Sequence, residues 1–356
     1  MKRTTIAAVA AALLMASVAN ASQAASNQLP TNLPGATTAV APPSGFDPLT
    51  ASDEDLATYG FPPRPAQASP AYAAWARAMK SSRERIFPQL EVTDIQNTVN
   101  RASANPNGRM TNTVGYSSNW SGPVSFSGAK SYGTTSFYYI IGDYVVPIAE
   151  QAIGACTGSW DWSSQWVGID GDGSSDVLQA GIEADALCSG GVTTPYYSAW
   201  YEWYVSGCNP ANNPCNEVRI SLPVTAGDDV FVEVWDTTST QGYAYIVNEN
   251  TNQYTQVGFK PPAGSGGKLV GNSAEWVVER PTVGGSLATL TNYTQDFFAD
   301  SFAYTFGSVL YDPGTTSNTL LDMQDSSGCV ISYPTTLGSY GIWFQDENSA
   351  RFNGYC

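Results

Sequence analysis

Residues 165–183 read QWVGIDGDGSSDVLQAGIE, which predicts two short strands, 165–170 and 177–183, joined by a turn. Alternate residues of a strand share a face, so one face of each strand is apolar and belongs to a core. The opposite faces carry an indole, an amide and two carboxylates, which belong to Trp166, Gln179, Asp170 and Glu183. A face that served only solubility would favour Lys, Thr and Ser. We therefore interpret this face as the lining of a cleft.

The composition of the 356-residue chain favours an all-β protein. Aromatic residues and glycine are abundant, and helical patterns are scarce after residue 110. From residue 116 onward, short alternating segments are separated by Gly, Asn, Asp and Pro, which is typical of an antiparallel β-sandwich. Further strands are predicted at 136–146, 195–205, 217–222, 229–235, 243–249, 274–279, 297–306 and 342–344.

The first 21 residues have the pattern of a secretory signal peptide. Lys2 and Arg3 precede an apolar run at 6–18, which is too short to span a membrane comfortably. Ala-Asn-Ala at 19–21 fits a cleavage site. We expect a secreted, extracellular protein that has no membrane anchor.

Six cysteines are compatible with three disulfides in an oxidising compartment. Cys208 and Cys215 flank an Asn- and Pro-rich turn, so we expect them to pair. For the others we predict pairing of Cys156 with Cys188 and of Cys329 with Cys356, although other pairings are possible. Metal binding is the alternative, but the sequence has no CxxC pair.

Charge is distributed unevenly along the chain, whose net charge is −16. Residues 1–110 hold 9 Lys and Arg against 7 Asp and Glu, whereas residues 111–356 hold 6 against 24. A domain this acidic will not bind nucleic acid through phosphates. Because low pH relieves its self-repulsion, we interpret it as a secreted domain made for acid. Solubility or salt tolerance is the alternative interpretation.

Residues 22–110 are predicted to be a pro-segment and linker that precede a catalytic domain at 111–356. The helix-favouring stretch at 70–87 is basic. Residues 22–70 before it are expected to be extended or disordered, and residues 88–113 after it to be a polar linker of low hydrophobicity. A basic segment could cover an acidic cleft at neutral pH and let go when carboxylates are protonated. The pro-segment would then be an intramolecular inhibitor. A linker with an incidental helix is the alternative.

The chain contains no histidine, which excludes Ser-His and Cys-His catalytic pairs and removes the commonest metal ligand. Acid–base chemistry must therefore come from carboxylates, tyrosines or the few lysines. Two further segments place carboxylates opposite an apolar face. YYSAWYEWYV at 196–205 carries Glu202, and AEWVVE at 274–279 carries Glu275 and Glu279.

Five motifs follow one another in order: SNWSG at 118–122, WVGIDGD at 166–172, LQAG at 178–181, AWYEWY at 199–204 and NSAEWVVE at 272–279. Together they resemble the glutamic peptidase family, the eqolisins, over most of residues 116–306. The resemblance implies a concanavalin-like antiparallel β-sandwich, or jelly roll, with the active site on the concave face of one sheet. It also implies endopeptidase activity on proteins or peptides at acidic pH, without a metal or cofactor. We expect a monomer.

The resemblance implies that the catalytic pair is Gln179 of LQAG and Glu275 of NSAEWVVE. In the substrate cleft it implies Trp120, Trp166, Asp170 and Glu202, together with Glu183, which stands where the family usually has an aspartate. The residue types suit peptide hydrolysis. Glu275 can take a proton from water and return it to the leaving nitrogen, and the amide of Gln179 can donate to the oxyanion.

Two other functions remain open on the sequence alone. A glycoside hydrolase on a similar jelly roll could use Glu202 and Glu275 as acid and nucleophile, but it would leave Gln179 without a role. A lectin-like binding module would suit the many tryptophans and would bind glycans without turnover.

Overall fold

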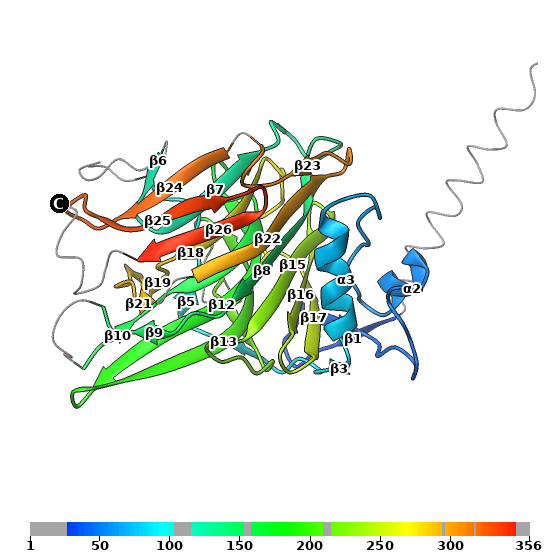
Figure 1. Cartoon of the computed structure of the whole chain (residues 1–356), viewed down its shortest axis with the longest axis horizontal. Coiled ribbons are helices and arrows are strands. Elements are labelled where there is room, and N and C mark those ends of the chain that lie inside the picture. The colour runs from blue at the N-terminus through cyan, green and yellow to red at the C-terminus, as the bar shows by residue number, and fades with distance from the viewer. Residues whose placement is uncertain are drawn as a thin grey trace, which may run out of the picture.

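The computed structural model describes residues 27–102, 115–152, 158–208, 215–293, 296–316 and 318–346. Strands dominate these residues and form two antiparallel sheets that pack face to face (Figure 1). This arrangement confirms the predicted β-sandwich. None of the helices in the described part of the chain has the length and apolar character needed to cross a bilayer.

The first sheet contains, in spatial order, β13 (Val192–Val205), β12 (Asp176–Ser189), β11 (Ser164–Ile169), β18 (Ser273–Glu279), β7 (Trp120–Phe126) and β24 (Asn318–Gln324). The second contains β17 (Gln253–Phe259), β16 (Gln241–Asn248), β15 (Asp229–Thr238), β8 (Phe137–Val145), β22 (Asp296–Thr305), β26 (Gly341–Asp346) and β25 (Val330–Leu337). Strand β25 also pairs with β24, so the two sheets are joined along one edge. Four of these strands, β7, β17, β24 and β25, have no counterpart among the predicted strands.

Short strands complete the described structure at the edges. They are β6 (Gly115–Ser117), β9 (Ala149–Glu150), β10 (Trp160–Asp161), β14 (Val218–Ile220), β19 (Thr282–Val283), β20 (Ser286–Leu287), β21 (Asn292–Tyr293) and β23 (Leu310–Tyr311).

The core between the two sheets is built by the alternation that the sequence shows. Val167, Leu178 and Trp276 point inward from the first sheet, and Val232 and Ile246 meet them from the second. Burial of these apolar side chains is the main term that stabilises the sandwich. The same alternation turns the polar residues of β11, β12, β13 and β18 to the outer face of the first sheet, which we call the site face.

Residues 27–102, which we call the N-terminal segment, wrap around the sandwich. They contain β1 (Gln28–Pro30), β2 (Thr37–Ala39), α2 (Asp53–Thr58), α3 (Ala71–Ser81), β3 (Glu84–Arg85), β4 (Leu90–Val92) and β5 (Ile95–Gln96). Strands β2 and β3 pair with β17, and β4 pairs with β14. The segment therefore adds strands to the sheets instead of forming the extended or disordered chain and polar linker that the composition predicts.

Helix α3 packs on the outer face of the second sheet, beside β15, β16 and β17 (Figure 1). Trp75 and Met79 are buried there against Phe231 and Tyr245. On the same helix, Arg77 forms ion pairs with carboxylates of the second sheet and its loops, which belong to Asp143, Glu249 and Asp300.

The predicted basic helix at 70–87 is thus shorter than expected, and it does not cover the predicted cleft. It ends at Ser81 because the next residues join the sheet: Glu84 donates its backbone N–H to Asn252, and Glu84–Arg85 pairs in parallel with β17. Arg77 faces the second sheet, on the other side of the sandwich from the site face, and Lys80 is exposed.

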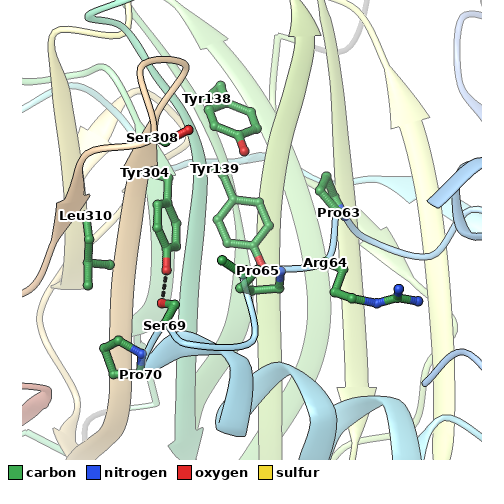
Figure 2. Close-up of a pocket in the computed structure, with 11 residues that line it drawn as sticks. Pro63, Arg64, Pro65, Ser69, Pro70, Tyr138, Tyr139, Tyr304, Ser308 and Leu310 are labelled. Carbon is green, nitrogen blue, oxygen red and sulfur yellow. Dashed lines mark hydrogen bonds between the residues drawn. The ribbon is translucent and has the colours of Figure 1, made fainter. Parts of the chain in front are cut away.

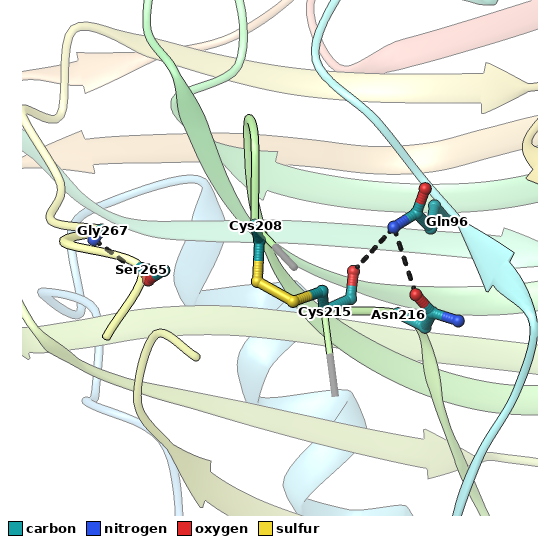
Figure 3. The surroundings of a disulfide bond; sticks show 6 residues. All are labelled: Gln96, Cys208, Cys215, Asn216, Ser265 and Gly267. Carbon is teal, nitrogen blue, oxygen red and sulfur yellow. Dashed lines mark hydrogen bonds between the residues drawn. A yellow bond between two sulfur atoms is a disulfide. The ribbon is translucent and has the colours of Figure 1, made fainter. Parts of the chain in front are cut away.

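The predicted disulfide between Cys208 and Cys215 is present (Figure 3). Cys188 and Cys329 are also disulfide-bonded. Their predicted partners, Cys156 and Cys356, lie outside the described residues.

Candidate active site

The predicted catalytic pair lies in one row across the first sheet. Glu202 of β13 stands opposite Gln179 of β12, Gln179 stands opposite Gly168 of β11, and Gly168 stands opposite Glu275 of β18. Residues opposite one another on adjacent strands point to the same face. Two strand spacings, roughly 10 Å, therefore separate the backbones of Gln179 and Glu275 on the site face.

Gly168 keeps the space between these two side chains open. A Cβ at this position would lie 2.8 Å from Cζ3 of Trp166 and 3.2 Å from Cβ of Gln179. Neighbouring side chains could not accept that contact without moving. Gln179 and Glu275 therefore share a space that is free of any side chain from the strand between them.

Tryptophans form the next row of the site face. Trp166 and Trp200 stand on either side of Gly181. A Cβ added at Gly181 would lie 2.1 Å from the backbone oxygen of Gln165, so only glycine fits there. Trp120 packs edge-on against Trp166, with ring centroids 5.0 Å apart and an interplanar angle of 77°. These indoles make one side of the site apolar.

The end of the N-terminal segment lies directly on the site face. The backbone N–H of Asn97 donates to Glu202 Oε2 at 2.8 Å, and the carbonyl oxygen of Asn97 accepts from Gln179 Nε2 at 2.5 Å. The N–H of Thr98 donates to Glu279 Oε1 at 3.0 Å, and its carbonyl accepts from Trp120 Nε1 at 2.9 Å. Site side chains thus bind all four backbone polar groups of two consecutive residues.

The contacts continue along the same stretch. Asn119 Oδ1 accepts from the backbone N–H of Arg101 at 2.9 Å, and its Nδ2 donates to the carbonyl of Val99 at 3.2 Å. The N–H of Asn100 donates to the carbonyl of Gly171 at 3.0 Å. Because these bonds run to the backbone, they can hold an extended peptide of almost any sequence.

The polar residues of the site face are buried. Gln179, Glu275 and Glu279 are each 0% exposed. Burial raises the pKa of Glu202, Glu275 and Glu279 well above the ordinary range of glutamate. At Glu279 the hydrogen bonds from Thr98, Asn119 and Trp166 favour the charged form and oppose that rise.

The N-terminal segment contributes to this balance through its hydrogen bonds. The backbone N–H groups of Asn97 and Thr98 donate to Glu202 and Glu279, and these bonds lower the pKa of the two carboxyl groups. Release of the segment by protonation of the cleft carboxylates stays a prediction.

More than half of the chain matches a known protein family. Residues 118–341 match the peptidase A4 family, and this range includes every motif quoted above. The chain belongs to the peptidase A4 family. It is therefore a hydrolase of peptide bonds, as the resemblance to glutamic peptidases implied.

Named relatives of this peptidase are fungal. Aspergillopepsin-2 of Aspergillus niger is 27% identical over 238 residues, which cover 63% of this chain and 76% of the relative. Scytalidopepsin B of Scytalidium lignicola is 27% identical over 197 residues, which cover 52% and 68% of the two chains. A crystal structure of scytalido-glutamic peptidase with a transition state analog inhibitor superposes with a TM-score of 0.50 at 22% identity, over 64% of this chain and 98% of that one. At that identity, the likeness concerns the fold.

The structure of this peptidase brings most of the predicted site residues together. Trp120, Trp166, Gln179, Glu202 and Glu275 line the site face around Asn97 and Thr98. Neither carboxylate oxygen of Glu275, nor Oε1 of Gln179, has a hydrogen-bond partner of good geometry among the described residues. The hydroxyl of Ser273 and the backbone amide of Asp172 still lie close enough to Glu275 to favour its charged form.

Asp170 has a different environment from the other predicted cleft residues. Its carboxylate accepts backbone N–H groups from Val270, Gly271 and Asn272 at 2.7, 3.0 and 2.8 Å. It therefore binds the loop that leads into β18, the strand that carries Glu275. Its own backbone has a φ of 69°, an uncommon value for a residue other than glycine.

Glu183 lies farther along β12, where it is buried beside Asp185 and Glu217. The side-chain Nδ2 of Asn97 reaches this group, at 3.2 Å from Glu217 Oε2 and 3.4 Å from Glu183 Oε1. These carboxyl groups thus surround one side chain of the N-terminal segment.

Several residues of the site were not predicted. Asn119 lies within SNWSG and Glu279 lies on the same strand face as Glu275, so the motifs and the alternation were signals that could have indicated both. Glu217 precedes a short strand and has no pattern that would indicate it. Asn97 and Thr98 lie in a polar stretch whose binding depends on backbone groups, which every sequence has.

Two pockets lie on the other side of the sandwich, between the N-terminal segment and the second sheet. One has a volume of about 350 Å³ and is lined by Pro63, Pro65 and a row of tyrosines that includes Tyr139 and Tyr304 (Figure 2). In it, the hydroxyl groups of Ser69 and Tyr304 are hydrogen-bonded. The other, about 460 Å³, is lined by residues that include Phe61 and Trp235. Neither contains a predicted site residue.

Proposed function

We propose that this peptidase is a secreted acid endopeptidase in which Glu275 activates water and Gln179 stabilises the oxyanion. The observation that carries the proposal is the 2.5 Å hydrogen bond from Gln179 Nε2 to the backbone carbonyl of Asn97, in the row that also holds Glu275. An amide that donates to a peptide carbonyl can also donate to the oxyanion formed from it.

The reaction follows from these positions. The carboxylate of Glu275 takes a proton from a water molecule, whose oxygen attacks the carbonyl carbon of the substrate. Gln179 Nε2 donates to the oxygen as it becomes negative. Its Oε1, which has no partner among the described residues, can accept from the same water. The protonated Glu275 then gives its proton to the leaving nitrogen as the C–N bond breaks. Glu275 ends the cycle as a carboxylate.

The other predicted residues bind and orient in this proposal. Glu202 accepts the N–H of the residue whose carbonyl reacts, and Trp120 donates to the next carbonyl, as they do with Asn97 and Thr98. Trp166 excludes water, and Glu183 contacts a substrate side chain. Asp170 positions Glu275 through the loop before β18.

The N-terminal segment is proposed to act as an intramolecular inhibitor. Its residues 97 and 98 use the backbone hydrogen bonds that a substrate would need, so they exclude substrate while they remain in place. We further propose that residues 1–21 are a signal peptide, that 22–110 are the pro-segment and linker, that 111–356 form the catalytic domain, and that the enzyme is a monomer.

Casein cleavage at a series of acidic pH values tests this proposal, with wild type beside Glu275→Gln. We expect wild type to cut casein in acid and the variant to be inactive while it keeps the wild-type circular dichroism. A β-glucan in a parallel assay should remain intact. Full casein cleavage by a folded Glu275→Gln variant would show that another group is the base.

A further inference from the structure

We propose that Glu183 and Glu217 form a specificity pocket that selects a side chain bearing N–H donors on the residue whose carbonyl is attacked. This inference rests on the proposed function, because Gln179 marks the reacting carbonyl. In the structure, Asn97 occupies the position of that residue. Its carbonyl meets Gln179, and its side-chain Nδ2 lies 3.2 Å from Glu217 Oε2 and 3.4 Å from Glu183 Oε1.

The sheet fixes one wall of this pocket. Glu183 follows Gln179 by four residues on β12, so both side chains point to the site face. Its distance from the reacting carbonyl is therefore set by strand geometry. Glu183 is 0% exposed, and its neighbour Asp185 is 4% exposed.

The other wall lies beside the Cys208–Cys215 disulfide and the N-terminal segment. Glu217 lies two residues after Cys215, which is bonded to Cys208. The backbone N–H of Glu217 donates to the carbonyl of Ile95 at 3.0 Å, and Gln96 Nε2 donates to the carbonyl of Cys215 at 3.2 Å (Figure 3). A bound peptide thus pairs with the residues that carry the pocket.

The pocket offers acceptors and negative charge. Burial raises the pKa of both carboxyl groups, and the hydrogen bond between them lowers the pKa of Glu183 while raising that of Glu217. Two carboxyl groups that are hydrogen-bonded to one another share a proton, so the pair together carries negative charge. Oδ1 of Asn97 has no partner among the described residues, so the donor end of the amide makes the contacts.

This chemistry favours an amide or an ammonium and disfavours an aliphatic side chain. Asn and Gln bring two N–H donors, and Lys brings three together with a positive charge. Leu has nearly the size of Asn, but it would leave a buried carboxylate without a donor, which is costly. Selection by such a pocket depends on this unpaired polar group more than on shape.

The test uses peptides with the sequence of residues 92–102, VTDIQNTVNRA, in which position 97 is Asn, Gln, Lys or Leu. Full-length protein that has been incubated in acid cleaves each peptide, and mass spectrometry identifies the bond. We expect kcat/KM for cleavage after position 97 to be about tenfold or more higher for Asn, Gln and Lys than for Leu.

Two variants assign the preference to the pocket. Glu217→Leu should favour the Leu peptide over the Asn peptide. Glu183→Gln removes one of the two carboxyl groups that share the charge but keeps an acceptor, so it should reduce the preference for Lys and keep that for Asn. This second variant keeps the test decisive if Glu217→Leu does not fold. Glu150→Gln, on an exposed residue of β9, is the control and should behave as wild type.

Equal cleavage of the Asn and Leu peptides by a wild-type protein that digests casein would overturn the pocket and leave the proposed function intact. A preference that survives unchanged in Glu217→Leu and Glu183→Gln would also overturn it. Failure to cut casein or any of the peptides would contradict the proposed function. It would also contradict the proposed pocket, which rests on that function.

Discussion

Nε2 of Gln179 donates a hydrogen bond to the backbone carbonyl of Asn97 at 2.5 Å, although the two residues are 82 positions apart in the chain. The contact links the first sheet of the sandwich to the end of the N-terminal segment. It places a peptide carbonyl of the protein itself against the amide that the motifs indicate for oxyanion binding. The predictions that follow concern this contact and the burial that accompanies it.

Substitution of Gln179 should reduce catalysis more than binding. Gln179→Ala removes the donor to the developing oxyanion, and we expect kcat to fall by about 10²–10³-fold with a smaller change in KM. Casein and peptide kinetics in acid measure this split. Gln165→Ala serves as the control. The backbone oxygen of residue 165 accepts from the hydroxyl of Tyr144, and this substitution keeps that hydrogen bond. A rise in KM alone would assign Gln179 to binding.

Weakening the contact at Thr98 should speed activation. Thr98→Pro removes the N–H that donates to Glu279 Oε1, and Thr98→Ser keeps it. We expect the proline variant to shorten the lag before casein cleavage after acidification and the serine variant to leave it unchanged. Equal lags in the two variants would mean that residue 98 does not restrain the enzyme.

Maturation should remove the N-terminal segment within residues 86–115, where the charge of the chain changes and the segment crosses the site face. N-terminal sequencing of protein from an acidified culture locates the new end. A mature chain that begins near residue 22 would contradict this prediction and the role of the segment as an inhibitor.

The folded chain should lose stability as pH rises toward neutral. Burial raises the pKa of Asp236 to about 8, well above the ordinary range of aspartate, so its protonated form stabilises the fold. That contribution is complete below about pH 4 and is lost as pH rises through about 8, at about 1.4 kcal/mol per pH unit for this one group.

Asp236→Asn isolates this contribution because the amide oxygen can still accept from Tyr132. In urea unfolding between pH 4 and 8, the variant should gain stability relative to wild type as pH rises. The exposed Glu150→Gln should give the wild-type slope. A wild-type protein that becomes more stable between pH 5 and 8, with Asp236→Asn parallel to it, would contradict the assignment.

Docking of helix α3 should depend on Trp75. This side chain is 0% exposed against the second sheet, so Trp75→Ala leaves a cavity and should cost about 3–5 kcal/mol of unfolding free energy in the full chain. Lys80→Ala, on the exposed face of the same helix, should change it by less than about 0.5 kcal/mol. Denaturant unfolding measures both. Similar values for the two variants would mean that α3 contributes little.

Local pattern was sufficient to predict the faces of the strands. Because side chains alternate strictly along a strand, the sequence alone separated Leu178 from Gln179 and Trp276 from Glu275, and the structure confirms both assignments. The same logic located Glu202 and Trp166. The motifs then indicated the family, which the match over residues 118–341 confirms.

Alternation along each strand could not predict the order of the strands across the sheet. Gly168 lies between Gln179 and Glu275 only because β11 is inserted between β12 and β18, and pairing between strands distant in the chain leaves no local mark. The same applies to Glu217, which reaches Asn97 because the neighbouring strand β14 pairs with β4 of the N-terminal segment. It applies also to helix α3, whose basic residues indicated the wrong face of the sandwich.

The sequence by itself determined which side chains share a face and which chemistry they carry, because a strand's period of two is a property of each segment. Tertiary structure alone decided that residues 97 and 98 lie against those side chains. Their backbone N–H and C=O groups make the bonds, and such groups are present at nearly every residue, so composition could not indicate where in the chain they would be used.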